Sequence, residues 1–143
     1  MSKPVELALV DTGLWFALCD DRDQHHLEAA RYEDILPLVT ILFPWPSLYE
    51  TLNSRFVRRR PVFERFEKCL SDYVLEFVND LPYREEALRR TLSFARVGKR
   101  PISMVDMIIR LMLNDDCLRK HYLITFNKED FFDVCLSNGI EML

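Results

Sequence analysis

Four carboxylates near the ends of apolar segments are the side chains of this chain whose type and spacing could do chemistry. They are Asp11, Glu50, Asp106 and Asp130. Asp11 ends the run 5–10, which predicts a buried strand because it is short, apolar and bounded by turn residues. All of the four except Asp106 follow a predicted strand, and open α/β sheets bind their ligands at that edge. The pattern therefore predicts one acidic site rather than four scattered charges.

The elements that must position these acids alternate between strand and helix. The apolar periodicity predicts strands at 5–11, 37–43, 73–78, 121–126 and 139–142. It predicts helices at 12–19, 24–36, 47–60, 62–71, 83–97, 103–118 and 128–137. Because parallel strands need crossover connections, this order indicates a mostly parallel central sheet flanked by helices on both faces. The expected fold class is a three-layer α/β architecture.

The composition is that of an ordinary globular protein. The chain has 143 residues, 49% of them hydrophobic, which predicts a single domain over 1–143 with a real core. The stretch 1–4 runs into the first strand without a basic region and a long apolar core, so we expect no signal peptide. No apolar run approaches the roughly 18 residues that a membrane helix needs. We therefore expect a cytoplasmic protein.

The net charge of −4, from 19 basic and 23 acidic residues, does not by itself indicate a nucleic-acid-binding protein. Basic residues nevertheless gather in two stretches, which could hold phosphates locally. The first contains Arg55, Arg58, Arg59 and Arg60, and the second contains Arg84, Arg89, Arg90, Arg96, Lys99 and Arg100. A solvated helix face is the commoner explanation for either stretch.

The cysteines Cys19, Cys69, Cys117 and Cys135 are widely separated and form no C-x-x-C pair. In a reducing compartment such cysteines are expected to be small, buried apolar residues.

Two of the acids fit local capping patterns. Ser47-x-x-Glu50 matches a capping box, in which the serine caps a helix and the glutamate returns a hydrogen bond. Ser103-x-x-Asp106 has nearly the same form, and Asp106 could also pair with Arg110 one turn later. Taken singly, each of these patterns is more often a helix cap than a metal ligand.

The other two acids, Asp11 and Asp130, could each stabilise the N-terminus of a helix. Taken together, however, capping does not account well for all four acids. Asp11 and Asp106 border strongly apolar segments, where an unpaired carboxylate is expensive to bury. A divalent cation would remove that penalty.

Four segments around these acids resemble the successive signatures of PIN-domain ribonucleases. The closest likeness is to the VapC-like toxins of bacterial type II toxin–antitoxin pairs. The segments are Val10-Asp11-Thr12-Gly13 with 20–26 behind it, Pro46-Ser47-Leu48-Tyr49-Glu50, Ile102-Ser103-Met104-Val105-Asp106 and Thr125-Phe126-Asn127-Lys128-Glu129-Asp130-Phe131. They occur in order and span essentially the whole chain, so the resemblance implies a PIN-like fold.

The resemblance implies an endoribonuclease that depends on Mg²⁺ or Mn²⁺ and uses the four acids as a catalytic and metal-binding quartet. Asp11 and Asp106 would be the central metal ligands, and Glu50 and Asp130 would act directly or through water. Hard divalent ions prefer carboxylate and water oxygens, which agrees with such an assignment.

The resemblance also implies supporting residues and partners. Thr12 and Thr125 match polar positions that support the site, and Asn127 would orient Asp130 or a water molecule. The implied partners are an RNA substrate, a cognate antitoxin protein and a second copy of the chain in a homodimer. The sequence departs from the common pattern in Pro44-Trp45-Pro46 before Glu50, and in Asn127, where many relatives carry an aspartate.

Two alternatives remain open at this point, and a third is excluded. The chain could be a free-standing PIN-domain nuclease of RNA processing. It could also be a non-catalytic PIN-like binding or assembly module, which dispersed acids or a blocked metal site would favour. An aspartate-nucleophile phosphatase would need a second aspartate two residues after Asp11, and that position is Gly13.

Overall fold

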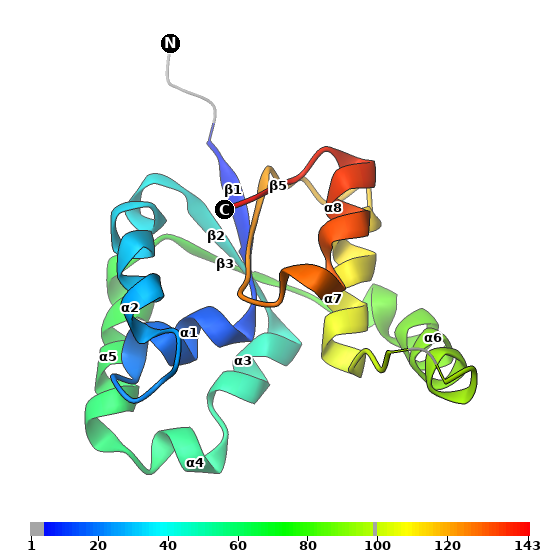
Figure 1. The fold of residues 1–143 in the computed structure, drawn as a ribbon. Helices are drawn as coiled ribbons and strands as arrows, with labels where there is room; N and C mark the ends of the chain where they lie inside the picture. Colours follow the sequence, from blue (N-terminus) through cyan, green and yellow to red (C-terminus); the bar gives the residue numbers. More distant parts are fainter. Residues whose placement is uncertain (1–4, 99) are drawn as a thin grey trace.

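The central sheet is described in a computed structural model that covers residues 5–98 and 100–143 (Figure 1). Its strands within those ranges are β1 Leu7–Val10, β2 Thr40–Pro44, β3 Leu75–Val78, β4 Tyr122–Ile124 and β5 Glu141–Met142. They hydrogen-bond in the order β3-β2-β1-β4-β5, and each neighbouring pair is parallel. The prediction of a mostly parallel sheet is confirmed.

The connections between the strands are helical. The α-helices are α1 Thr12–Cys19, α2 His26–Ala29, α3 Trp45–Thr51, α4 Ser54–Val57, α5 Arg60–Asp72, α6 Arg84–Arg96, α7 Met104–Asn114 and α8 Phe132–Asn138. Short 3-10 turns are η1 Ala30–Asp34, η2 Leu36–Leu38, η3 Leu81–Tyr83 and η4 Lys128–Asp130. In Figure 1, α1, α2 and α5 lie on one side of the sheet, and α6, α7 and α8 lie on the other. The expected three-layer α/β architecture is therefore confirmed.

Three predicted helices are broken into shorter pieces, and one of them, 128–137, is the 3-10 turn η4 followed by α8. The predicted helix 24–36 is α2 followed by 3-10 turns, the second of which contains Pro37. The predicted helix 47–60 is interrupted after α3, where the Asn53 side chain accepts a hydrogen bond from Phe56 N at 3.0 Å and caps α4. A good N-cap between two helical stretches favours a new helix over continuation of the old one.

Side chains alternate along the strands and divide the core into two layers. Ala8 and Val10 of β1 pack with the α1 and α5 side, whereas Leu9 between them packs with the α7 and α8 side. In the first layer the buried Trp15 stacks on Phe43, with ring centroids 5.0 Å apart. Both faces of the sheet are thus buried, as an all-parallel sheet requires.

The strand order sets the position of the functional edge. From β1 the chain proceeds to β2 on one side, whereas β4 joins β1 on the other, so the strand order reverses between β1 and β4. Val10 of β1 is in register with Ile124 of β4, and Asp11 N donates to Ile124 O at 3.0 Å. Ligands of open α/β sheets bind where the strand order reverses, which here is the edge that carries Asp11 and Thr125.

The cysteines are free, as expected, but not all of them are buried. Cys19 and Cys135 are buried and Cys69 is half-buried. Cys117 is exposed, so the prediction of burial is wrong there. It lies in the turn after α7, where its backbone N donates to Asp115 Oδ1 at 2.9 Å.

None of the helices in the described ranges combines the length and the apolar character that crossing a membrane would require.

Candidate active site

Asp11 lies directly after β1 and caps α1. Its Oδ1 accepts from Thr12 N at 2.8 Å, and its Oδ2 accepts from Thr125 Oγ1 at 2.9 Å. The residue is only 8% exposed. Burial raises the pKa of this carboxyl group, and the hydrogen bond from Thr125 opposes that rise. Asp11 is therefore both a cap and a buried carboxylate held in one orientation from two sides.

Glu50 lies in α3 and faces Asp11 across the start of α1. Its Oε1 accepts from Thr12 Oγ1 at 2.9 Å. Partial burial, and more weakly the charge of Asp11, raise the pKa of Glu50. Thr12 thus contacts both acids, one through its backbone N–H and the other through its hydroxyl.

The predicted capping box at Ser47 and Glu50 is wrong. The helix begins at Trp45, with Pro46 in its first turn, where the fixed φ of proline and its missing N–H are best tolerated. Ser47 is consequently inside the helix and buried, and within the described residues its hydroxyl has no hydrogen-bond partner. Glu50 is left free to bond Thr12 instead.

Asp106 lies in the first turn of α7, and its backbone N donates to the capping Ser103 Oγ at 3.1 Å. The predicted cap at Ser103 is therefore confirmed. Burial, followed by the charges of three neighbouring acids, raises the pKa of Asp106 to about 7. Those neighbours are Asp11, Asp130 and Glu50.

The predicted pairing of Asp106 with Arg110 is wrong. Arg110 instead makes two hydrogen bonds to the Asp133 carboxylate, at 2.7 and 2.8 Å, and donates to Asp130 O at 2.6 Å. A bidentate contact between an arginine and a carboxylate is stronger than an i,i+4 ion pair on one helix, which contributes about 0.2–0.5 kcal/mol.

Asp130 is buried at the end of η4 and is held by two side chains. Asn127 Nδ2 donates to its Oδ2, and Arg100 forms an ion pair with its Oδ1 at 3.0 Å. The Asn127 backbone N also donates to Thr125 Oγ1 at 3.0 Å, which connects this segment to the Thr125 that holds Asp11. A chain of hydrogen bonds thus joins the acids that follow β1 and β4.

Asp11, Glu50 and Asp106 line one groove of about 510 Å³. Its other lining residues are Thr12, Gly13, Phe16, Asn53, Ser103 and Asn127. Asp130 is not part of the lining, but it is close enough for its charge to raise the pKa of Asp106. The structure thus brings the predicted acids together, with Asp130 beside the groove.

The donor set of this groove suits a hard divalent cation. It consists of carboxylate oxygens that raise one another's pKa, and such ions prefer ligands of this kind. As the side chains lie, no three acidic, histidine or cysteine side chains in 5–98 and 100–143 are placed to share one ion. The groove therefore offers the oxygen ligands that a divalent cation prefers, but the side chains are not already arranged around an ion.

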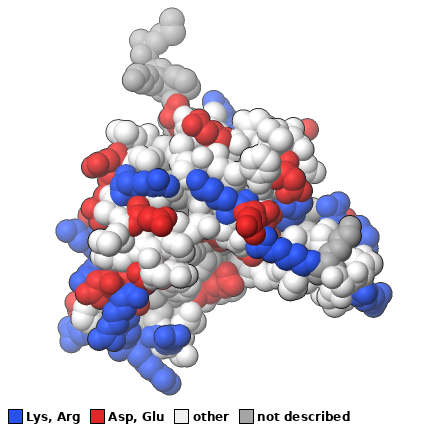
Figure 2. All heavy atoms as spheres, viewed as in Figure 1, with Lys and Arg blue, Asp and Glu red and all other residues white. Residues whose placement is uncertain are grey.

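Both basic stretches contain arginines that are already paired, and in the first stretch Arg59 pairs with Asp20 and Arg60 with Glu64. In the second stretch, Arg84 pairs with Asp80, and both Arg89 and Arg90 pair with Glu86. Lys99 lies outside the described residues. Figure 2 shows basic side chains gathered at the lower left, where Figure 1 places α4 and α5, and again at the right over α6.

Three residues near the acids were not assigned to the site from the sequence. Phe16 lies one helical turn after Thr12, on the same face of α1, and that spacing is a readable signal. Asn53 lies just past the end of α3, three residues after Glu50, and its Nδ2 donates to Glu50 O at 2.8 Å. Arg100 reaches Asp130 from a distant segment, and no sequence signal indicates that contact.

Known proteins were compared with the chain by sequence and by structure. No protein-family model matches the sequence, and a search of curated proteins found no match. Among solved structures, the chain is similar to VapC20 from Mycobacterium tuberculosis, a toxin that cleaves the sarcin–ricin loop. That similarity has 21% identity and a TM-score of 0.65, over 86% of this chain and 92% of that one.

The chain is also similar to a structure of VapBC2 from Rickettsia felis bound to a DNA fragment from the promoter of that pair. The identity is 13% and the TM-score 0.61, over 96% of this chain and 97% of that one. The PIN-like fold implied by the sequence resemblance is confirmed by these two likenesses.

Proposed function

We propose that this chain is a divalent-metal-dependent endoribonuclease that acts as the toxin of a toxin–antitoxin pair. One observation carries the proposal. Acids from three separate elements line one groove, and burial together with their mutual repulsion raises the pKa of Asp106 to about 7. Strongly shifted pKa values cluster at functional sites, where charged groups are buried close to one another in a cleft.

The structural likenesses support the choice of substrate and partner. VapC20 is a toxin that cleaves the sarcin–ricin loop, which favours RNA as the substrate of this chain. The VapBC2 pair favours a cognate antitoxin as the partner protein. We further propose that residues 1–143 form a single nuclease domain that works as a homodimer in the cytoplasm, where such an RNA is found.

In this proposal Asp11 and Asp106 hold Mg²⁺ or Mn²⁺, with Glu50 and Asp130 contributing directly or through water. Such an ion, when bound, supplies a Lewis acid that neutralises charge on the phosphate and activates water. The chain's own residues orient the acids. Thr12 and Thr125 donate to Glu50 and Asp11, and Asn127 donates to Asp130.

The proposal predicts that Asp106→Asn and Asp11→Asn each reduce Mn²⁺-dependent RNA cleavage at least about 100-fold. Loss of residues that merely orient metal ligands already costs about 10–100-fold, so loss of a ligand should cost at least as much. Cleavage is measured on a labelled RNA with and without EDTA. Asp116→Asn is the matched control, because Asp116 is an exposed acid just past the far end of α7.

Full cleavage by the native protein in EDTA would contradict the metal requirement. Full cleavage by Asp106→Asn would contradict the quartet. If the native protein binds RNA and never cuts it, the non-catalytic PIN-like module becomes the better interpretation.

A further inference from the structure

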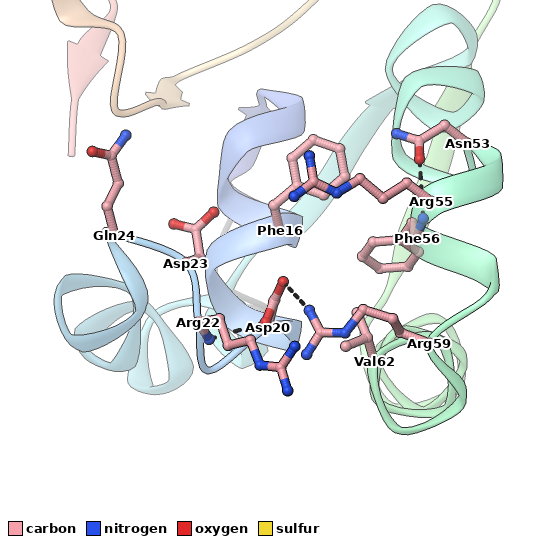
Figure 3. Close-up of a pocket in the computed structure, with 10 residues that line it drawn as sticks. All are labelled: Phe16, Asp20, Arg22, Asp23, Gln24, Asn53, Arg55, Phe56, Arg59 and Val62. Carbon is pink, nitrogen blue, oxygen red and sulfur yellow. Dashed lines mark hydrogen bonds and ion pairs between the residues drawn. The ribbon is translucent and has the colours of Figure 1, made fainter.

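A second cavity adjoins the acidic groove. It has a volume of about 570 Å³ and shares Phe16 and Asn53 with the groove. Figure 3 shows two walls, one formed by the end of α1 with the residues that follow it, and the other by α4 with the start of α5. A chain of nucleotides that lies in the acidic groove can therefore continue into this cavity without leaving the surface.

The charges that line the cavity sum to one positive charge, because three arginines stand against two aspartates. Its lining includes Arg22, Arg55 and Arg59 against Asp20 and Asp23. Arg59 Nη1 and Asp20 Oδ2 form an ion pair at 2.5 Å, and that pair lowers the pKa of Asp20. The Asp23 Oδ1 atom accepts a hydrogen bond from a backbone N–H at 2.8 Å.

In the part of the chain that the structure describes, Arg22 and Arg55 are the two lining arginines whose guanidinium groups are not held in an ion pair, although the charge of Arg22 helps to lower the pKa of Asp20. Both residues are exposed, and within the described residues neither guanidinium group makes an ion pair or a hydrogen bond. In Figure 3, Arg55 extends from α4 toward the wall formed by α1. This distinguishes the cavity from α6, whose Arg89 and Arg90 are already paired with Glu86.

The floor of the cavity is aromatic. Phe16 and Phe56 pack against each other with ring centroids 5.6 Å apart, and Phe16 is half-buried. Proteins bind single-stranded RNA by combining guanidinium contacts to phosphates with aromatic surfaces for the bases. The volume also lies within the range of about 300–1,000 Å³ that is typical of small-molecule sites.

We infer that this cavity binds the nucleotide next to the cleaved bond of single-stranded RNA. Arg22 and Arg55 contact its phosphates, and its base lies against Phe16, whose ring packs on the buried Phe56. The inference rests on the proposed nuclease function. The groove concentrates carboxylates, which repel a polyanion, so adjoining cations are needed to hold the RNA there.

The test is RNA binding by protein that carries Asp106→Asn throughout, so that cleavage does not interfere. The probe is a fluorescein-labelled single-stranded RNA of about 12 nucleotides, followed by anisotropy between about 50 and 200 mM KCl. Arg22→Gln with Arg55→Gln should weaken binding about tenfold at the low salt concentration. It should also reduce the slope of log K against log salt by about 1.4, because each phosphate contact to a single strand contributes about 0.7.

Two matched variants serve as controls. Arg89→Gln with Arg90→Gln removes two charges that are already paired on α6 and should leave both the affinity and the slope unchanged. Arg22→Lys with Arg55→Lys keeps the charge and should keep the slope. Since both arginines are exposed, the melting temperature of the double variant should equal that of its parent.

The outcomes separate this inference from the proposed function. Failure of the native protein to cleave any RNA would count against the nuclease, and the binding measurement does not depend on cleavage. If the native protein cleaves RNA and the Arg22 and Arg55 double variant binds the probe as the α6 control does, the inference is overturned. The cavity would then serve a protein partner or no ligand.

Discussion

Among the acids of the site, Asp106 has a pKa that its surroundings raise to near neutral pH. Burial first, and then the charges of Asp11, Asp130 and Glu50, raise its pKa from the ordinary 3.8 to about 7. The folded protein therefore binds more protons than the unfolded chain between those two values. The contribution of Asp106 to the stability of the metal-free protein therefore decreases as the pH rises from about 4 to about 7. Above about pH 7 that contribution is fully lost.

Asp106→Asn should remove this contribution. We expect the free energy of unfolding of the metal-free variant, measured by urea denaturation, to fall less between acidic and neutral pH than that of the native protein. At neutral pH the variant should be as stable as the native protein or more so. The stabilisation by Mn²⁺, which grows as RT ln(1 + [L]/Kd), should be lost.

Asp116→Asn is again the control and should behave as the native protein does. If Asp106 only stabilises the helix end, millimolar Mn²⁺ should leave the melting temperature of the native protein unchanged. Asp106→Asn should then lower the free energy of unfolding by about 1–2 kcal/mol, as the loss of a helix cap does. That pair of results would contradict the metal site.

Among the elements, helix α7 carries both Asp106 and Arg110. The side chain of Arg110 connects this helix to the segment that carries Asp130. The Arg110 guanidinium donates to Asp130 O at 2.6 Å and to the Asp133 carboxylate of α8. The side chain is only 19% exposed, so its contact with the carbonyl group is shielded from water. This contact holds two acids of the site on separate elements at a set separation.

Arg110→Met keeps most of the aliphatic stem and removes both contacts. We expect RNA cleavage to fall about 10–100-fold, as with other losses of residues that orient a metal site. Urea denaturation should show a smaller effect, a loss of about 1 kcal/mol for the hydrogen bond to the carbonyl group. Asp133→Asn removes the charge of an exposed partner but keeps the contact with Asp130 O, so it should cleave nearly as well as the native protein. Equal losses in the two variants would show that the position of Asp130 does not depend on Arg110.

At the scale of the whole molecule, an exposed aromatic cluster on α3 and β3 suits a subunit interface. Trp45 and Phe77 are 38% and 41% exposed, and their rings stack with centroids 4.9 Å apart. Tyr49, 71% exposed, lies against Trp45 at 6.2 Å. Aromatic residues are enriched at the centres of protein interfaces, and contiguous exposed apolar patches are uncommon on monomers.

We expect the native protein to be a homodimer at high micromolar concentration by light scattering. Tyr49→Asp should shift it toward the monomer, because it places a charge where an interface would exclude water. Leu136→Asp is the matched control, since Leu136 of α8 is also 71% exposed and lies outside the cluster. A native protein that is monomeric under these conditions would contradict the dimer, and equal effects of the two variants would place the interface elsewhere.

The sequence by itself determined where the main strands end and which carboxylates follow them. Both are local properties, because an apolar run and the turn residues after it lie within one short window. Asp11 directly after β1 is an example, and the Ser103 cap at the start of α7 is a local signal of the same kind for a helix. The alternation of strands and helices likewise indicated a parallel sheet, since crossover connections leave few other arrangements.

The tertiary structure alone decided which group each acid contacts. Glu50 bonds Thr12, 38 residues away, and not its local candidate Ser47. Arg110 contacts Asp133 instead of Asp106, and Arg100 reaches Asp130 across 30 positions of the sequence. Local pairs contribute only a few tenths of a kcal/mol, so the packing of elements against the sheet overrides them. For the same reason the cavity beside the groove could not be read from the chain, because its two walls become neighbours only when α1 and α4 pack on the same side of the sheet.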